Sequence, residues 1–429
     1  MEKKNKLNKK IITLMHILIG LLCILLLFKN SDYLVQKESE QIKKKPLEIE
    51  IWTIHGDIER ALSQSIEKYK SQYPEIEFKV KVFKNEVYQS AIANAMVTDT
   101  LPDIFFNWGY QKLKYYVDAD VVLDITDYIE KKDIIKDMKP GVMDGFTFQN
   151  RYYAMPLFGW SASLFCNRQV FEQNKIPYPS TYEELLNVID EFKKKDIIPI
   201  ATGGKEAWLT SLYYMSLVLE SGTKNDVYQA AVDIKKFNSE PFVQAAERFE
   251  RLVQIKPWQE NYSEDDSYNA AYFFTQGNTA MLLTGSWVSS AIDASDSMVK
   301  GNVDVIPFPI QNLSQTVGGY VDTYVLSKNS VMSQDEEYIN LFLDLMISVS
   351  KISCNDLGIG LPVYNNLEVD KEKFPTLYQC NLIDKGKDHH PAYDQIFDAN
   401  LTNRYYDLLS SLMLGEIKAS KFIEELSKE

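Results

Sequence analysis

The stretch FFTQGNTAMLLTGSW, residues 273–287, decides the fold of this chain. Its first part is typical of a helix that ends at Gly277, because a residue without a Cβ readily adopts the left-handed conformation of a helix cap. Residues 279–283 form a short apolar run of the kind that makes a buried strand. A Gly-Ser turn then places Trp287 at the end of that strand. Since ligands of open α/β sheets bind at strand ends, the segment predicts an α/β fold with a ligand contact at Trp287.

Strands and helices alternate on the N-terminal side of the chain as well. Apolar and charged residues alternate over 47–51 and over 76–82, which is the period of a strand. Amphipathic helices are predicted over 58–73 and 86–97, and a third strand over 103–106. Strand, helix, strand, helix, strand in this order indicates a parallel sheet with helices on its faces.

The alternation starts again after Tyr153. A strand over 164–166 is followed by a helix over 181–195, whose first residues have the spacing of a capping box. A strand over 197–201 comes next. The length of 429 residues favours two domains, and the restart predicts two α/β lobes.

The N-terminus predicts export across a membrane. Five lysines among the first ten residues precede an unbroken apolar run over 11–28, which is at the lower edge of the length that spans a bilayer. The basic flank keeps the N-terminus inside and sends the remainder out. The run does not end in the small residues of a cleavage site, so an uncleaved anchor is expected. Lipidation of Cys23 stays open.

Charge and cysteine content exclude some classes of protein. The formal net charge is −14, and because the first 30 residues carry a net +5, the exported part carries about −19. Such an acidic surface is unsuited to nucleic acid or anionic lipid. Beyond the anchor only Cys166, Cys354 and Cys380 occur, and three widely spaced cysteines make no disulfide framework.

Several segments resemble, in chain order, those of the bacterial extracellular solute-binding proteins of family 1, the maltose-binding-protein-like sugar receptors of ABC importers. The segment at 273–287 is one of them. Cys166, Arg168 and Tyr182 depart from the usual residues of the family, but they lie on a strand and a helix outside the ligand positions. The other segments are LPDIFFNW (101–108), RYYAMPLFGWSASLFCNRQVFEQNKIPYPSTYEELL (151–186), VIPFP (305–309), GGYVDTYVLSKNS (318–330) and GLPVYNNL (360–367).

The resemblance implies a two-lobe fold of the type II periplasmic-binding-protein kind. Each lobe would be a mixed, mostly parallel sheet flanked by helices, with a ligand cleft between the lobes. The chain is then expected to divide into an N-terminal signal anchor (1–29), a flexible stalk (30–45), an N-terminal lobe (46–158 and 309–350) and a C-terminal lobe (159–308 and 351–429).

The resemblance also implies function: an extracytoplasmic receptor on the cell membrane that delivers a sugar or oligosaccharide to an ABC permease and its cytoplasmic ATPase. A sugar ring needs aromatic planes for its C–H face and fixed polar groups for its hydroxyls. Trp52 is expected in the core, Trp258 in surface packing, and Asp57 has the alternative role of a helix cap. The candidate ligand contacts are His55, Asp57, Asn107, Trp108, Trp160, Trp208, Trp287, Gly319, Tyr320 and Asp322.

No catalytic residue, cofactor or metal site is expected, and the protein is predicted to be a monomer and not an enzyme. The motifs at 159–163 and 203–205 are incomplete forms of a serine-nucleophile elbow and a P-loop. His389 and His390 lack a metal-ligand spacing. Three alternatives stay open: a receptor that feeds a sensor kinase, an enzyme that degrades polysaccharide, and a binding protein for a polyol, glycerol phosphate or a peptide.

Overall fold

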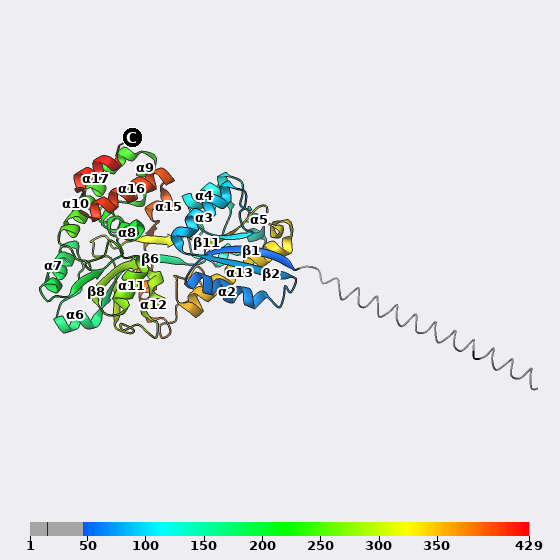
Figure 1. Ribbon diagram of the computed structural model, residues 1–429, viewed down its shortest axis with the longest axis horizontal. Coiled ribbons are helices and arrows are strands. Elements are labelled where there is room, and N and C mark those ends of the chain that lie inside the picture. The colour runs from blue at the N-terminus through cyan, green and yellow to red at the C-terminus, as the bar shows by residue number, and fades with distance from the viewer. Residues whose placement is uncertain (1–14, 16–45, 429) are drawn as a thin grey trace, which may run out of the picture. The chain divides into compact units, whose positions relative to one another are not determined.

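The computed structural model describes Met15 and residues 46–428 (Figure 1). Apart from Met15, the expected signal anchor over 1–29 and stalk over 30–45 lie outside the described residues, so both stay predictions. Within the described part of the chain, no helix is long and apolar enough to cross a membrane.

The chain divides into two compact units. Besides Met15, the described part of the small unit is residues 46–49 and 70–78, where the N–H of Leu47 donates to the carbonyl of Glu75 at 2.7 Å. The large unit holds residues 50–69 and 79–428 and carries every candidate site residue.

One sheet has four strands in the order β11-β3-β1-β2. β1 runs parallel to β3, with Ile51 opposite Ile104, and β11 runs antiparallel to β3. The side chains of Ile51 and Thr53 are buried while those of their neighbours Glu50 and Trp52 are not, as the predicted alternation requires. The strands are β1 (Leu47–Ile54), β2 (Ile76–Phe83), β3 (Ile104–Trp108) and β11 (Asp322–Leu326).

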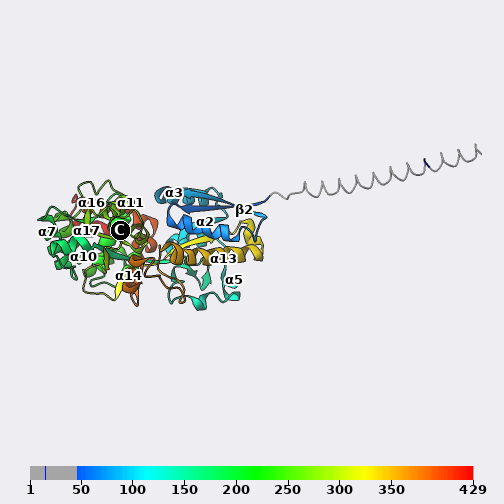
Figure 2. The same ribbon diagram turned by 90° about the horizontal axis from the view of Figure 1, so that it is seen from below.

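The first two predicted helices are confirmed with small changes in their ends. The helix expected over 58–73 is α2 (Asp57–Tyr69), and the helix expected over 86–97 is α3 (Asn85–Val97). α2 lies beside α13 (Glu336–Ile352) in Figures 1 and 2, and the hydroxyl of Ser65 donates to the carbonyl of Leu345 at 3.2 Å. The sheet therefore has a covering layer built from two segments nearly 300 residues apart in the sequence.

The other sheet follows the order β12-β10-β6-β8-β7, and β9 also pairs with β6. All nine residues of β6 and all seven of β8 are buried, and in β8 this agrees with the apolar run that predicted the strand. The larger sheet is mixed, as predicted, but it is not mostly parallel: β6 runs antiparallel to β8, β9 and β10, whereas the β10–β12 and β7–β8 pairs are parallel. The strands are β6 (Gly159–Asn167), β7 (Ile198–Ala201), β8 (Thr279–Gly285), β9 (Val303–Ile306), β10 (Gln315–Tyr320) and β12 (Asp388–His390).

The segment over 273–287 has the predicted structure. Helix α11 (Ser267–Thr275) ends just before Gly277, which has a φ of 76° and donates its N–H to the carbonyl of Phe274 at 2.8 Å. β8 then runs two residues further than predicted, and a single 3-10 turn, Ser286–Val288, carries Trp287.

Helices cover the larger sheet as well. α8 is buried over 209–218, and it packs against α10 and α16 (Figure 1). The hydroxyl of Thr181 accepts the N–H of Glu184 at 3.3 Å, so the predicted cap of α7 is confirmed. The remaining helices and short strands are α4 (Gln111–Asp118), α5 (Thr126–Lys131), β4 (Thr147–Phe148), β5 (Arg151–Tyr152), α6 (Arg168–Asn174), α7 (Tyr182–Lys193), α8 (Ala207–Val218), α9 (Lys224–Val232), α10 (Glu240–Gln254), α12 (Ser289–Ile292), α14 (Pro375–Asp384), α15 (Tyr393–Ile396), α16 (Ala399–Met413) and α17 (Ala419–Leu426).

The chain passes between the two sheets at a small set of backbone contacts, which we call the crossing. The N–H of Leu157 donates to the carbonyl of Asp322 at 2.9 Å. Gly159 exchanges hydrogen bonds with Leu361 at 2.9 and 2.7 Å, and it pairs with Tyr320 in the β10–β6 ladder. Only residue 321 separates β10 in the larger sheet from β11 in the smaller one.

The burial of β8 leads to a stability prediction. Leu283 is completely buried and pairs with Leu164 of β6, so Leu283→Ala should lower the free energy of unfolding by about 2–5 kcal/mol. Leu313→Ala is the matched control, because that side chain is 51% exposed and its removal should change the value by less than about 0.5 kcal/mol. Urea unfolding followed by circular dichroism measures both. Equal effects of the two substitutions would contradict the assignment of β8 to the core.

Candidate functional site

Three of the predicted tryptophans form one aromatic cluster. The ring centroids of Trp160 and Trp287 lie 5.0 Å apart at 64°, and those of Trp208 and Trp287 lie 5.8 Å apart at 58°. Trp160 comes from β6, Trp208 from the first turn of α8, and Trp287 from the turn after β8. Trp160 is buried, whereas Trp208 and Trp287 keep exposed surface. We call these residues the tryptophan cluster.

Two glycines admit the aromatic rings of this region. A Cβ on Gly285 would lie 2.0 Å from the ring of Trp287, and a Cβ on Gly159 would lie 2.6 Å from the ring of Tyr320. Any side chain at these two positions would displace the ring, because real Cβ contacts do not occur below 3.0 Å. The Gly-Ser turn of the sequence is therefore required for the place of Trp287.

Asp57 contacts a neighbour of the tryptophan cluster, Ser290. It is the first residue of α2, and its carboxylate accepts hydrogen bonds from Arg60 at 2.5 Å and from the hydroxyl of Ser290 at 2.6 Å. Ser290 lies three residues after Trp287 and also contacts the Trp287 carbonyl at 3.4 Å. His55 lies apart from this arrangement, with an exposed ring whose Nδ1 is 3.2 Å from Glu59.

Trp108 lies at the end of β3 next to a lysine. Its ring packs edge-on against Phe106, with centroids 4.9 Å apart, and the Nζ of Lys112 lies 4.8 Å from its centroid. Lys112 also forms an ion pair of 2.5 Å with Asp394 of α15. An ammonium over an indole face is a favourable cation–π contact.

Asp322 is the first residue of β11 and lies opposite Trp108 in the β11–β3 ladder. Its side chain keeps some exposed surface, yet protein atoms surround it closely. This burial raises the pKa of the Asp322 carboxyl to about 7, and the nearby charge of Lys112 opposes the rise. The group therefore exchanges its proton near neutral pH.

The other predicted contacts lie at or behind the crossing. Asn107 is buried, and its side-chain oxygen has no hydrogen-bond partner among the described residues. Gly319 pairs with Trp160 between β10 and β6. Tyr320 is buried, and its hydroxyl donates to the carbonyl of Pro362 at 3.3 Å, so this hydroxyl is already engaged by the protein. Burial raises the pKa of Tyr320.

The crossing connects these groups. The N–H of Gly109, which follows Trp108, donates to the carbonyl of Val321 at 2.7 Å. Asp322 lies opposite Trp108, and it follows Tyr320 by two residues. Tyr320 in turn pairs with Gly159, the residue before Trp160. The structure brings the predicted contacts to one region, with His55 at its edge.

Sequence reasoning missed three polar residues of this region and misplaced two tryptophans. Lys112, Asp394 and Ser290 were not predicted; the one available signal was the place of Lys112, four residues after Trp108 at the start of a helix. Trp258, expected in surface packing, is buried edge-on against Tyr213, with centroids 5.9 Å apart. Trp52, expected in the core, keeps exposed surface and donates its indole N–H to Glu50 at 2.7 Å.

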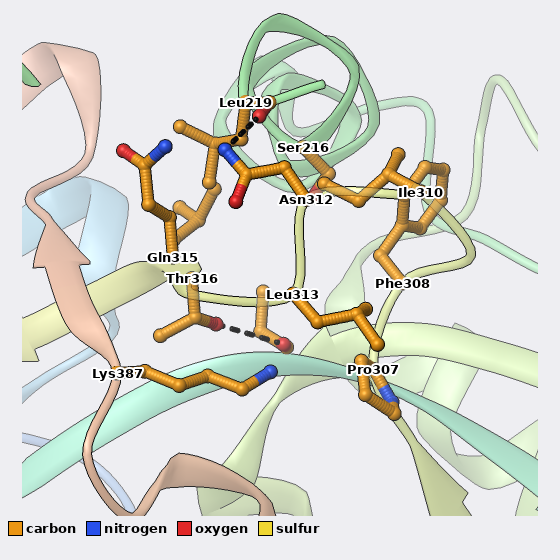
Figure 3. Close-up of a pocket in the computed structure, with 12 residues that line it drawn as sticks. Ser216, Leu219, Pro307, Phe308, Ile310, Asn312, Leu313, Gln315, Thr316 and Lys387 are labelled. Carbon is orange, nitrogen blue, oxygen red and sulfur yellow. Dashed lines mark hydrogen bonds between the residues drawn. The ribbon is translucent and has the colours of Figure 1, made fainter. Parts of the chain in front are cut away.

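A separate cavity lies between α8 and the chain leading into β10 (Figure 3). Its volume is about 20 Å³, which is room for a water molecule and far below the several hundred Å³ of typical ligand pockets. Its polar lining includes Asn312, which donates to the carbonyl of Leu219 at 3.1 Å, and Thr316. It contains none of the predicted ligand contacts.

The two neighbouring histidines have separate partners. His389 Nε2 lies 2.8 Å from Asp384, and His390 contacts Gln315. Burial lowers the pKa of His390 to about 4. Over the described residues, no group of three or more His, Cys, Asp or Glu side chains is arranged to hold a metal ion.

Comparison with known proteins identifies the family. The sequence pattern described as "Bacterial extracellular solute-binding protein" matches residues 55–348. The chain belongs to this family. Over 336 residues it is 20% identical to the multiple sugar-binding protein of Streptococcus mutans serotype c, and the alignment covers 75% of this chain and 76% of that protein.

Solved structures establish the two-lobe fold that the family resemblance implied. A chain studied for xylan utilization by Caldanaerobius polysaccharolyticus has a TM-score of 0.82 and 22% identity, covering 89% of this chain and 99% of that one. A chitin oligosaccharide binding protein has a TM-score of 0.79 and 19% identity, covering 89% and 98%. At these identities the likeness shows the fold alone.

The contact of Gly285 with Trp287 gives a testable prediction. Gly285→Ala should displace the indole and change the near-ultraviolet circular dichroism of the tryptophan cluster, because the added methyl would lie 2.0 Å from the ring. In a Trp287→Ala background the same substitution should have little effect on the melting temperature, since the obstructing ring is gone. Additive effects of the two substitutions would rule out this contact.

The raised pKa of Asp322 predicts a pH dependence of stability. Between about pH 4 and pH 7 the folded state keeps a proton that the unfolded state releases, so unfolding releases protons and the contribution of this carboxyl to stability falls as pH rises. Above about pH 7 the contribution is constant. The melting temperature of Asp322→Asn relative to wild type should therefore increase from pH 4 to pH 7. Asp99→Asn, at an exposed aspartate, is the control and should follow wild type.

Proposed function

We propose that this protein is the extracytoplasmic substrate-binding component of an ABC importer, which binds a sugar or oligosaccharide between its two lobes and delivers it to the membrane permease. The observation that carries the proposal is the tryptophan cluster, joined through Ser290 to Asp57 at the start of α2. Membership of the extracellular solute-binding family supports the same role.

The chemistry of this region suits a carbohydrate. Indole faces receive the C–H face of a sugar ring, and carboxylates accept hydrogen bonds from its hydroxyls. Trp108 and Trp287 keep exposed surface, and Asp57 and Asp322 supply carboxylates beside them. The names of similar proteins mention multiple sugars, xylan and chitin oligosaccharide, so we propose an oligosaccharide as the ligand.

The proposed lobes are those of the sequence analysis, 46–158 with 309–350 and 159–308 with 351–429. The pairing of β10 with β6 supports moving residues 315–320 to the second lobe, with the boundary at residue 321. Asp57–Ser290 and Lys112–Asp394 then join one lobe to the other. Closure of the lobes on the ligand would form these contacts, and separation of the lobes would break them.

The location and partners complete the proposal. The apolar run over 11–28 holds the receptor at the cell membrane, with the lobes outside. Anchoring raises the effective concentration of the receptor at its permease. The partners are the permease subunits and their cytoplasmic ATPase, and the receptor acts as a monomer by binding without catalysis.

Thermal-shift measurements on the full chain test the proposal. Xylo-, chito- and malto-oligosaccharides are compared with amino acids, peptides and polyol phosphates. One glycan class should stabilise the protein, by about 2.7 kcal/mol at a hundredfold excess over Kd. Trp287→Ala should abolish the shift, whereas Trp52→Ala, the matched control outside the tryptophan cluster, should keep it. A shift with a non-sugar only, or full binding by Trp287→Ala, would refute the proposal.

A further inference from the structure

We infer that Lys112 is a positioning residue of the ligand site, which holds the Trp108 ring in place for a sugar while it is bound to Asp394. The inference rests on the proposed function and adds a residue to the site. Lys112 contacts both Trp108 and Asp394: its Nζ is 4.8 Å from the Trp108 centroid and 2.5 Å from Asp394. Its positive charge also opposes the rise in the pKa of Asp322, which lies opposite Trp108 between β11 and β3.

The backbone before Lys112 is strained. Tyr110 has a φ of 59° and a ψ of −133°, a combination that non-glycine residues rarely adopt. Two contacts hold it there: its N–H donates to the Gly145 carbonyl at 2.7 Å, and its ring occupies the space where a Cβ of Gly145 would lie. After this strained turn α4 begins at Gln111, three residues after Trp108. The effect of the turn is to place the ammonium of Lys112 over the indole.

The charge of Lys112 is also in an unfavourable place for the helix. Lys112 is the second residue of α4, whose first turn has no acidic residue. The N-terminus of a helix carries partial positive charge, so a lysine there destabilises the helix slightly. A strained turn and an unfavourable charge occur together at one point, which is typical of functional sites.

The ammonium of Lys112 is paired with one carboxylate and has a weaker electrostatic effect on a second. Asp394 forms the direct ion pair with Lys112, and the exposed fractions of the side chains are 23% for Lys112 and 14% for Asp394. The same positive charge opposes the rise in the pKa of Asp322 on β11. Burial raises the pKa of Tyr324 on β11, and the negative charges of Glu59 and Asp322 add to the rise. Tyr405 and Tyr406 of α16 are titratable groups near Asp394; burial raises the pKa of both hydroxyls, and the negative charge of Asp394 contributes to the rise.

The effect of Lys112 on the pKa of Asp322 gives a measurement that a loss of packing would not change. If Lys112 is removed, Asp322 loses its neighbouring positive charge and its pKa rises further. If Asp394 is neutralised instead, Lys112 is free to interact with Asp322, whose pKa then falls. The two substitutions at the same ion pair thus shift the titration of Asp322 in opposite directions, which loss of packing would not do.

The test compares Lys112→Met, Lys112→Arg and Asp394→Asn in the full chain. The matched control is Lys114→Met, which breaks an exposed ion pair of the same length, 2.5 Å, with Asp118 on the same helix. Isothermal titration with the oligosaccharide that stabilises wild type gives Kd. The pH at which the melting temperature stops falling relative to that of the same chain carrying Asp322→Asn gives the titration of Asp322 without any ligand.

Lys112→Met should raise Kd roughly tenfold, as expected when a binding site loses pre-organisation, and should move the pH midpoint upward. Asp394→Asn should move the midpoint downward, Lys112→Arg should stay near wild type in Kd, and Lys114→Met should change neither. Oligosaccharide binding by wild type with unchanged Kd and midpoint in Lys112→Met would overturn the inference and leave the proposed function standing. Absence of carbohydrate binding by wild type itself would overturn the proposed function, and the inference with it.

Discussion

The hydrogen bonds of the crossing are the constraint on which the rest of this structure depends. Gly159 exchanges two hydrogen bonds with Leu361, and the ring of Tyr320 covers the face where a side chain of Gly159 would lie. One residue further along β6 is Trp160, and two residues beyond Tyr320 is Asp322. The backbone that connects the two sheets is therefore the same backbone that carries an indole and a carboxylate of the candidate site. A shift of the crossing by one residue would turn both side chains to the opposite faces of their strands, because the side-chain period of a strand is two.

The fold was predictable from the sequence because its signals are local. The burial alternation of β1, the continuous apolar run of β8, the left-handed glycine after α11 and the cap of α7 depend on residues close together in the chain. The direction of strand pairing in the larger sheet was not predictable in the same way. β6 pairs with three strands that lie more than 100 residues downstream, and periodicity carries no information about the partner of a strand.

The residues of the candidate site likewise fall into those with a local sequence signal and those without one. Tryptophans at strand ends have a sequence signal, and three of them meet in one cluster. Lys112 and Asp394 have none, since 282 residues separate them and each is an ordinary charged residue on a helix. Trp258 was misplaced because the proline before it indicated a loop, whereas packing against Tyr213 in the fold buries it. Polar residues that complete a site become visible only when the fold brings distant segments together.

Several features of this region reduce stability, and their coincidence is itself informative. The strained turn at Tyr110, the orphaned oxygen of Asn107 and the closely surrounded carboxyl of Asp322 lie within a few residues of the crossing. Each is unfavourable in the folded state, so the packed sheets on either side must hold it in place. The indole N–H of Trp208 also lacks a partner among the described residues. A sugar presents hydroxyls that both donate and accept, so binding in this region would satisfy such groups together. The polar groups that are left unsatisfied in the folded protein would then be the groups that give a sugar its affinity.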